Sequence, residues 1–159
     1  MRVADVHNHF YPPEYLNALK SKKSAVRVTM GKDGNPHIHY PGDYNVAVPG
    51  HRDIAYRQGV LEKEGVDTQV ITLTTPGTHV EKADFAAKMA SLVNDAFAKI
   101  IVERGPRFAA LATLPLNSPK ASVKELKRAT EQLKLPGAML FSNVNGTALA
   151  DKRFWPIYE

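Results

Sequence analysis

The chain has no cysteine among its 159 residues, which excludes disulfides, thiolate metal ligands and a cysteine nucleophile together. Any metal ion would have to be held by histidine and carboxylate side chains, a donor set that favours zinc, manganese or iron. Long apolar runs are also lacking, so we expect no membrane-spanning segment, no secretory signal and a cytoplasmic protein. Hydrophobic residues still make up 43% of the chain, which is enough to bury a core.

Clustered positive charge is missing as well, although the formal net charge is +5. The densest group of lysines, within residues 20–23, has no interleaved aromatic side chains on which bases would stack. Lys124, Lys127 and Arg128 fall on the polar side of an amphipathic segment, where they face solvent. We therefore expect no nucleic-acid partner, and the positive balance would suit an anionic carboxylate substrate.

Two histidines lie close to the N-terminus, at the end of a short apolar segment. Arg2–His7 predicts a first strand, and the chain turns away at Tyr11-Pro12-Pro13. Side chains on a strand alternate with a period of two, so His7 and His9 share one face. The two imidazoles can therefore reach one divalent ion at the carboxyl end of the strand.

A second histidine pair, His37 and His39, has the same spacing in different surroundings. It follows the Gly/Asp/Pro turn at residues 31–36 and predicts, with Val26–Met30, an exposed β-hairpin. We interpret these two histidines as structural or surface residues. The hairpin belongs to an insert spanning residues 22–50.

Strand and helix patterns alternate four times along the chain. The predicted strands are Arg2–His7, Thr68–Leu73, Phe108–Leu114 and Gly137–Phe141. The predicted helices are Pro13–Lys20, Arg52–Glu64, Glu81–Glu103 and Ser118–Leu133, with a further helical segment from Asp151. This alternation predicts an α/β fold with a parallel sheet and helical crossovers.

A complete eight-fold barrel needs about 250 residues. We therefore expect residues 1–159 to form the N-terminal half of a single TIM-barrel domain, about its first four β/α units, with the C-terminal half absent. Half a barrel exposes two strand edges. The chain would then be truncated or would pair with another half, and we expect a homo-oligomer.

The segment Asp5-Val-His7-Asn-His9-Phe resembles the opening motif of the amidohydrolase superfamily. Later stretches are similar to its branch of aminocarboxymuconate-semialdehyde decarboxylase and related aromatic-acid decarboxylases: Gly105–Phe108, Leu111–Leu116, Ala121–Arg128, Gly137–Phe141, Asn143–Gly146 and Arg153–Pro156. The resemblance implies a (β/α)₈ barrel with one divalent metal, usually zinc, with Mn²⁺ or Fe²⁺ as alternatives. It assigns His7 and His9 as metal ligands, and Asp5 would orient an imidazole. The other ligands and the catalytic base belong to later strands, so no catalytic residue is expected within residues 1–159.

The activity that this resemblance implies is metal-dependent decarboxylation of an aromatic or enoic carboxylic acid. Metal-dependent hydrolysis of an amide, ester or lactone is an alternative, because a bound metal can activate water instead. A non-catalytic, truncated barrel fragment is a third. Arg52 is the preferred candidate for pairing with the substrate carboxylate, ahead of Arg57. The simpler interpretation of both is a solvated arginine or an ion pair with Glu62 or Glu64.

Overall fold

The computed structural model describes all residues from 1 to 159. At its centre is a three-stranded parallel sheet in the order β1 (Ala4–Asp5), β5 (Thr68–Ile71) and β6 (Phe108–Ala110). Beyond the end of β6, Ala112 forms a parallel bridge with Ala138. The fourth predicted strand therefore lies next to β6 but is reduced to this single bridge. The neighbours in the sheet follow their order along the chain.

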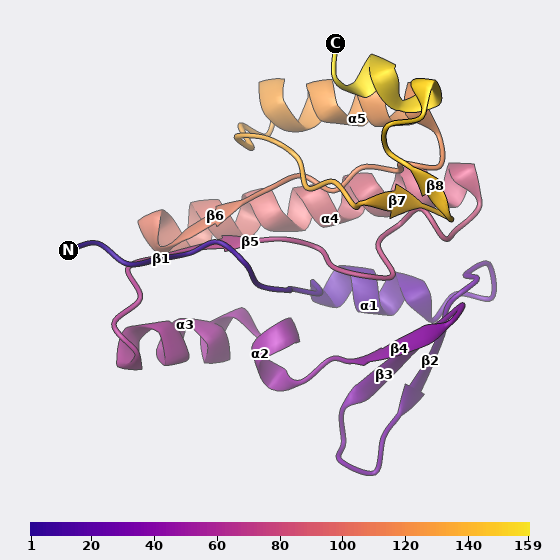
Figure 1. The fold of residues 1–159 in the computed structure, drawn as a ribbon. Helices are drawn as coiled ribbons and strands as arrows, with labels where there is room; N and C mark the ends of the chain where they lie inside the picture. The colour runs from indigo at the N-terminus through magenta and orange to yellow at the C-terminus, as the bar shows by residue number, and fades with distance from the viewer.

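Helices connect and cover these strands. They are α1 (Pro13–Leu19), α2 (Pro49–Arg52), α3 (Ile54–Lys63), α4 (Ala83–Arg104) and α5 (Pro119–Glu131), with 3₁₀ turns η1 (Gly105–Arg107) and η2 (Lys152–Ile157). Figure 1 shows α4 running along β5 and β6, with α5 beside α4 and α3 on the opposite side of the sheet in this view. None of the helices combines the length and the apolar character needed to cross a membrane. The structure confirms the predicted α/β class.

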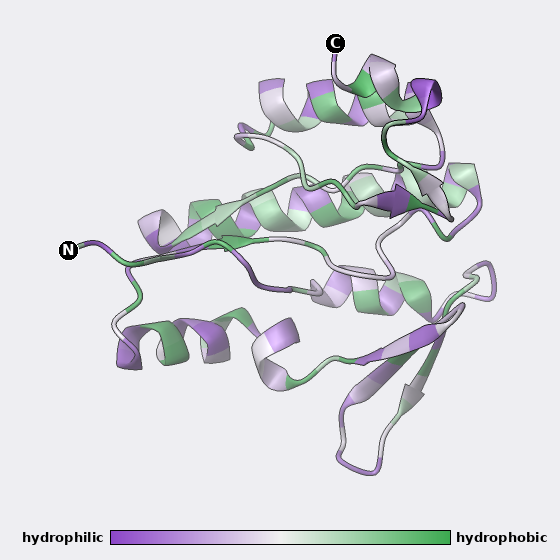
Figure 2. Ribbon diagram, viewed as in Figure 1, coloured by the Kyte–Doolittle hydropathy of each residue, from purple (hydrophilic) through white to green (hydrophobic).

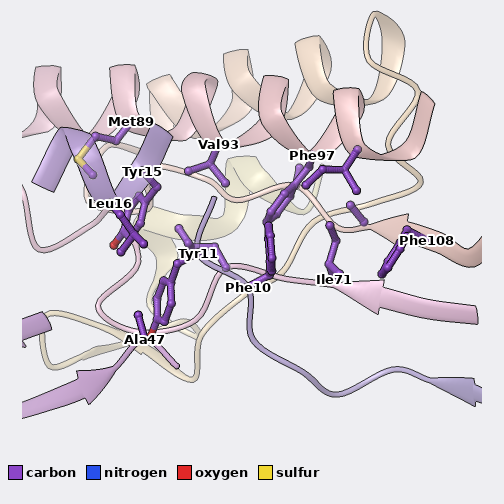
Figure 3. Close-up of a cluster of buried hydrophobic side chains, with 14 of the residues drawn as sticks. Phe10, Tyr11, Tyr15, Leu16, Ala47, Ile71, Met89, Val93, Phe97 and Phe108 are labelled. Atoms are coloured by element: carbon purple, nitrogen blue, oxygen red, sulfur yellow. The ribbon is translucent and has the colours of Figure 1, made fainter. Parts of the chain in front are cut away.

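The main core lies between the parallel sheet and α4. Helix α4 contributes a stripe of buried side chains at helical spacing, Met89, Val93, Phe97 and Ile100. The sheet contributes Ile71 and Phe108, and Phe10 enters from the connection after β1, as Figure 3 shows. Figure 2 shows hydrophobic residues gathered on β5 and β6, whereas β3 and β4 are largely hydrophilic.

The insert is larger than the predicted hairpin. It is a three-stranded antiparallel sheet in the order β2 (Arg27–Met30), β3 (Pro36–Tyr40) and β4 (Asp43–Val46). The sequence prediction missed β4 because four residues are too few to set a strand apart from a loop. His37 and His39 lie on β3, and both rings stack on Tyr44, at centroid distances of 5.9 and 5.8 Å.

Two further predictions need correction. The helix predicted over Arg52–Glu64 is α3, which begins only at Ile54, because Asp53 adopts an extended backbone that separates it from the unpredicted short helix α2. The carboxylate of Asp53 accepts hydrogen bonds from the backbone N–H groups of Ala55 and Tyr56 and so caps α3.

The first strand, predicted over Arg2–His7, is only Ala4–Asp5. The histidine pair therefore follows the strand instead of lying on it. A short two-stranded ribbon, β7 (Asn143–Val144) with β8 (Thr147–Ala148), precedes η2.

Candidate metal centre

His7 and His9 come together immediately after β1. Their ring centroids are 5.7 Å apart and the rings are tilted by 48°. His7 is exposed, and His9 is partly buried. The structure thus brings the two predicted ligands side by side, with both rings accessible from the same open space.

That space is a cleft with a volume of about 560 Å³. One wall is the segment His7–His9, another is formed by α2 with Val48, and the third is α3. The lining side chains include three imidazoles, one guanidinium and several uncharged groups, but no carboxylate. A cleft with this lining favours an anionic ligand.

His51 of α2 is the third imidazole, and no local pattern predicts its position in the cleft. Its ring centroid lies 6.2 Å from that of His9, although 42 residues separate them. Nδ1 of His51 lies 3.3 Å from the carbonyl oxygen of Val46. A carbonyl only accepts, so Nδ1 is the donor in this contact.

The surroundings of His9 favour the neutral form of its ring. Burial lowers the pKa of His9, and the positive charges of His51, His7 and Arg57 lower it further. Neutral imidazole is the form that binds a metal ion, since the ligating nitrogen needs a free lone pair. The electrostatics of the cleft therefore suit His9 to the ligand role.

Asp5 acts on the backbone of this segment. Oδ1 of Asp5 accepts a hydrogen bond from the backbone N–H of His7 at 3.1 Å, and Oδ2 accepts from Nε2 of Gln69 at 2.5 Å. Neither imidazole donates a hydrogen bond to its carboxylate. The expected contact between Asp5 and an imidazole is thus replaced by support of the turn that carries His7.

Arg52 lies outside the cleft. Its Nε donates to the carbonyl oxygen of Ala47 at 2.9 Å, and one terminal nitrogen donates to Oδ1 of Asn35 at 3.3 Å. The guanidinium thereby ties the end of the insert to the turn between β2 and β3. Arg57, the less favoured arginine in the sequence, lines the cleft instead and forms no ion pair with Glu62 or Glu64.

His7 and His9 fit a divalent ion as two of its ligands. Structural zinc takes four protein ligands and catalytic zinc usually three. No group of three or more histidine and carboxylate side chains converges on one point in the structure. The two imidazoles could therefore supply only part of a coordination shell, and neither Asp5 nor His51 joins them in a group of three.

Comparison with known proteins identifies a family that the sequence matches. A family model described as Amidohydrolase matches residues 4–159. The 2-amino-3-carboxymuconate-6-semialdehyde decarboxylase of Dictyostelium discoideum is 36% identical over 100 residues, which are 62% of this chain and 28% of the relative.

Solved structures share the fold. The apo form of IDCase from Metarhizium anisopliae matches with a TM-score of 0.85 at 22% identity, over 99% of this chain and 47% of that one. A dihydroxybenzoic acid decarboxylase from Polaromonas sp. JS666, with bound manganese and the inhibitor 2-nitroresorcinol, matches with a TM-score of 0.71 at 19% identity, over 99% and 46%. The chain spans less than half the length of each of these proteins. Since the family model covers nearly all of the sequence, including the histidine pair after the first parallel strand, the chain belongs to the Amidohydrolase family.

Proposed function

We propose that this chain is part of a metal-dependent decarboxylase acting on an aromatic or enoic carboxylic acid. The observation that carries the proposal is the pairing of His7 and His9 in a cleft that no carboxylate lines. Such a cleft can hold a cation through neutral imidazoles and still admit an anionic substrate. The named activities of the relative and of the manganese-containing neighbour support decarboxylation as the reaction class.

We further infer that residues 1–159 supply the first four units of a (β/α)₈ barrel, with residues 22–50 as an insert. Two sheet edges, β1 and Gly137–Phe141, have no neighbour beyond them. Later strands would pair with these edges and would bring the remaining metal ligands and the groups that transfer protons. Association into a homo-oligomer belongs to the same proposal.

Zinc is the metal we propose, and the manganese in the Polaromonas structure supports Mn²⁺ as a substitute. When bound, the ion supplies positive charge that stabilises the negative charge left on the substrate as CO₂ departs. The chain itself would contribute the two imidazoles, and the lowered pKa of His9 favours the neutral ring that ligates a metal. The charge of the buried Arg57 beside the cleft would draw the substrate carboxylate toward it without forming hydrogen bonds to it.

The test is a product assay on the native protein isolated from its source, once its intact mass is known. A mass well above 17.5 kDa would show that further strands are present. The zinc- or manganese-loaded protein is incubated with aromatic acids labelled with ¹³C in the carboxyl group. Release of labelled CO₂ supports the proposal. Cleavage of amides, esters or lactones without CO₂ release would assign hydrolysis instead, and inactivity in both panels would favour a non-catalytic fragment.

A further inference from the structure

Arg57 of α3 holds together three segments that are distant in the sequence. The residue is only 6% exposed. Its Nε donates to the carbonyl oxygen of Gly50 in α2 at 2.6 Å. One terminal nitrogen donates to Oδ1 of Asn8 at 2.7 Å and to Oε1 of Gln69 at 3.0 Å, and the other donates to the carbonyl oxygen of His9. One guanidinium thus joins the histidine segment, α2 and β5.

The acceptors around Arg57 are all uncharged. Three are backbone or side-chain carbonyls next to the cleft, and the fourth, Gln69, donates in turn to Asp5. Burial lowers the pKa of Arg57 to about 10, with Asp5 opposing the change, so the guanidinium remains charged at neutral pH. A buried cation is costly unless hydrogen bonds satisfy it, and here the protein itself fills most of its donor positions.

The donor count argues against Arg57 as a substrate-binding group. Four of its five N–H groups already have partners within the chain. Binding a carboxylate through two parallel hydrogen bonds would require two free donors on one edge of the guanidinium. The hydrogen bonds of Arg57 instead go to the chain segments that form the cleft.

We propose that Arg57 is a positioning residue, whose guanidinium fixes the segment His7–His9 against α2 and so sets the distance between the paired imidazoles and His51. Other contacts hold this segment mainly to the strand behind it: Asn8 donates to the carbonyl oxygen of Val70 at 2.7 Å, the hydroxyl of Thr72 donates to that of Asn8 at 2.7 Å, and the backbone N–H of Phe10 donates to that of Thr72 at 2.9 Å. Toward α2, the backbone N–H of Tyr11 donates to the carbonyl oxygen of His51 at 2.7 Å, next to the contacts of Arg57. That Arg57 fixes this segment rests on the geometry alone. Only the consequence for metal binding rests on the proposed function.

The experiment measures local opening by amide hydrogen exchange in the chain of 159 residues. The reporting amides are those of Phe10 and Tyr11, which donate to Thr72 and His51, and the reference amides are those of Val93 and Phe97 within α4. In Arg57→Met, loss of hydrogen bonds from a charged donor should speed exchange at Phe10 and Tyr11 by about tenfold or more relative to α4. Arg57→Lys should fall between wild type and Arg57→Met, because one ammonium cannot span the three segments. It also provides a folded variant if Arg57→Met does not fold.

Arg128→Met is the matched control. Arg128 also joins separate segments, binding Asp95 at 2.7 Å and Glu125 at 2.8 Å, but it lies between α4 and α5, away from the cleft. This variant should lose stability without any selective change at Phe10 and Tyr11. The proposal would be overturned if the Arg57 variants sped amide exchange equally at Phe10 and Tyr11 and in α4, or sped it at neither.

Zinc titration of the same variants gives an independent result. Arg57→Met should weaken zinc binding by roughly 10–100-fold, the range observed when support of ligands is removed, whereas Arg128→Met should not. If wild type binds no zinc, the proposed metal function fails. The amide-exchange measurement still decides whether Arg57 fixes the segment His7–His9 against α2. If zinc binds and Arg57→Met leaves its affinity unchanged, the positioning role is wrong.

Discussion

Nδ2 of Asn94 in α4 donates a hydrogen bond to Oε1 of Glu125 in α5 over 2.7 Å. The same amide group exchanges two hydrogen bonds with the backbone of Thr113, at 3.0 and 2.8 Å. One buried side chain therefore links both outer helices to the strand that runs on from β6. Glu125 completes the network by accepting from Ser91 and Arg128.

This network predicts loss of stability in acid. Burial raises the pKa of Glu125, but hydrogen bonds from Arg128, Asn94 and Ser91 outweigh it and hold the pKa below the ordinary 4.5. A carboxylate with a lowered folded-state pKa stabilises the fold above its unfolded value. That contribution is lost as the pH falls from about 4.5 through the folded-state pKa.

Glu125→Gln should therefore lower the free energy of unfolding at pH 7 by about 2 kcal/mol and flatten its decline below pH 4.5. Urea denaturation at a series of pH values measures both effects. Glu131→Gln, at the exposed end of the same helix, should change neither. A wild-type and a Glu125→Gln protein with parallel pH profiles would refute the role of Glu125.

The loop after β5 predicts a strong effect at Gly77. Its φ is +65°, and a Cβ would lie 3.0 Å from Nδ1 of His79 and 3.1 Å from the ring of Phe141. Gly34, with φ of +75°, has open space around its Cβ position. Gly34→Ala should cost about 1 kcal/mol through backbone strain alone.

Gly77→Ala should cost about 1–3 kcal/mol more than Gly34→Ala, because the added methyl group overpacks the loop. Denaturant melts of the two variants compare them directly. Equal destabilisation would mean that His79 and Phe141 move aside without cost.

A further prediction concerns the attachment of the insert to the parallel sheet. Nδ2 of Asn45 in β4 donates to the carbonyl oxygen of Thr75 at 2.8 Å, and the hydroxyl of Tyr40 donates to Oγ1 of Thr75 at 3.1 Å. Asn45→Ala should speed amide exchange within β3 and β4 by about tenfold while leaving α4 unchanged. Asn17→Ala, which removes only an exposed contact with Lys20, is the control. Unchanged exchange in Asn45→Ala would show that other contacts hold the insert.

Local sequence patterns were sufficient where an element depends on its own residues. The apolar stripe and Gly105 predicted a helix over Glu81–Glu103, and α4 spans Ala83–Arg104. The spacing of His7 and His9 predicted that the two rings would lie together, as they do, although the pair follows β1 instead of lying on it. Period and capping signals act over a few residues, so a single sequence reveals them.

Features that depend on distant contacts escaped prediction. Strand β4 has only four residues, too few for their alternation to predict a strand, and it forms because β3 offers it an edge. His51 and Arg57 reach the cleft only because Asp53 ends α2 and starts α3, which turns both side chains toward the segment after β1. No spacing rule links residues 42 or more positions apart. Closeness to the connecting loop favours Arg52 in the sequence, whereas the structure places Arg57 in the cleft.

The most direct test of the account is calorimetric titration of the metal-free chain with Zn²⁺, using the two histidine pairs as each other's control. The double variant His7→Ala/His9→Ala should lose more affinity than the roughly 10–100-fold that supporting residues contribute. The double variant His37→Ala/His39→Ala, with the same spacing on β3, should bind zinc as wild type does. Zinc binding that survives loss of His7 and His9, or that disappears with His37 and His39, would contradict the assignment of the metal centre.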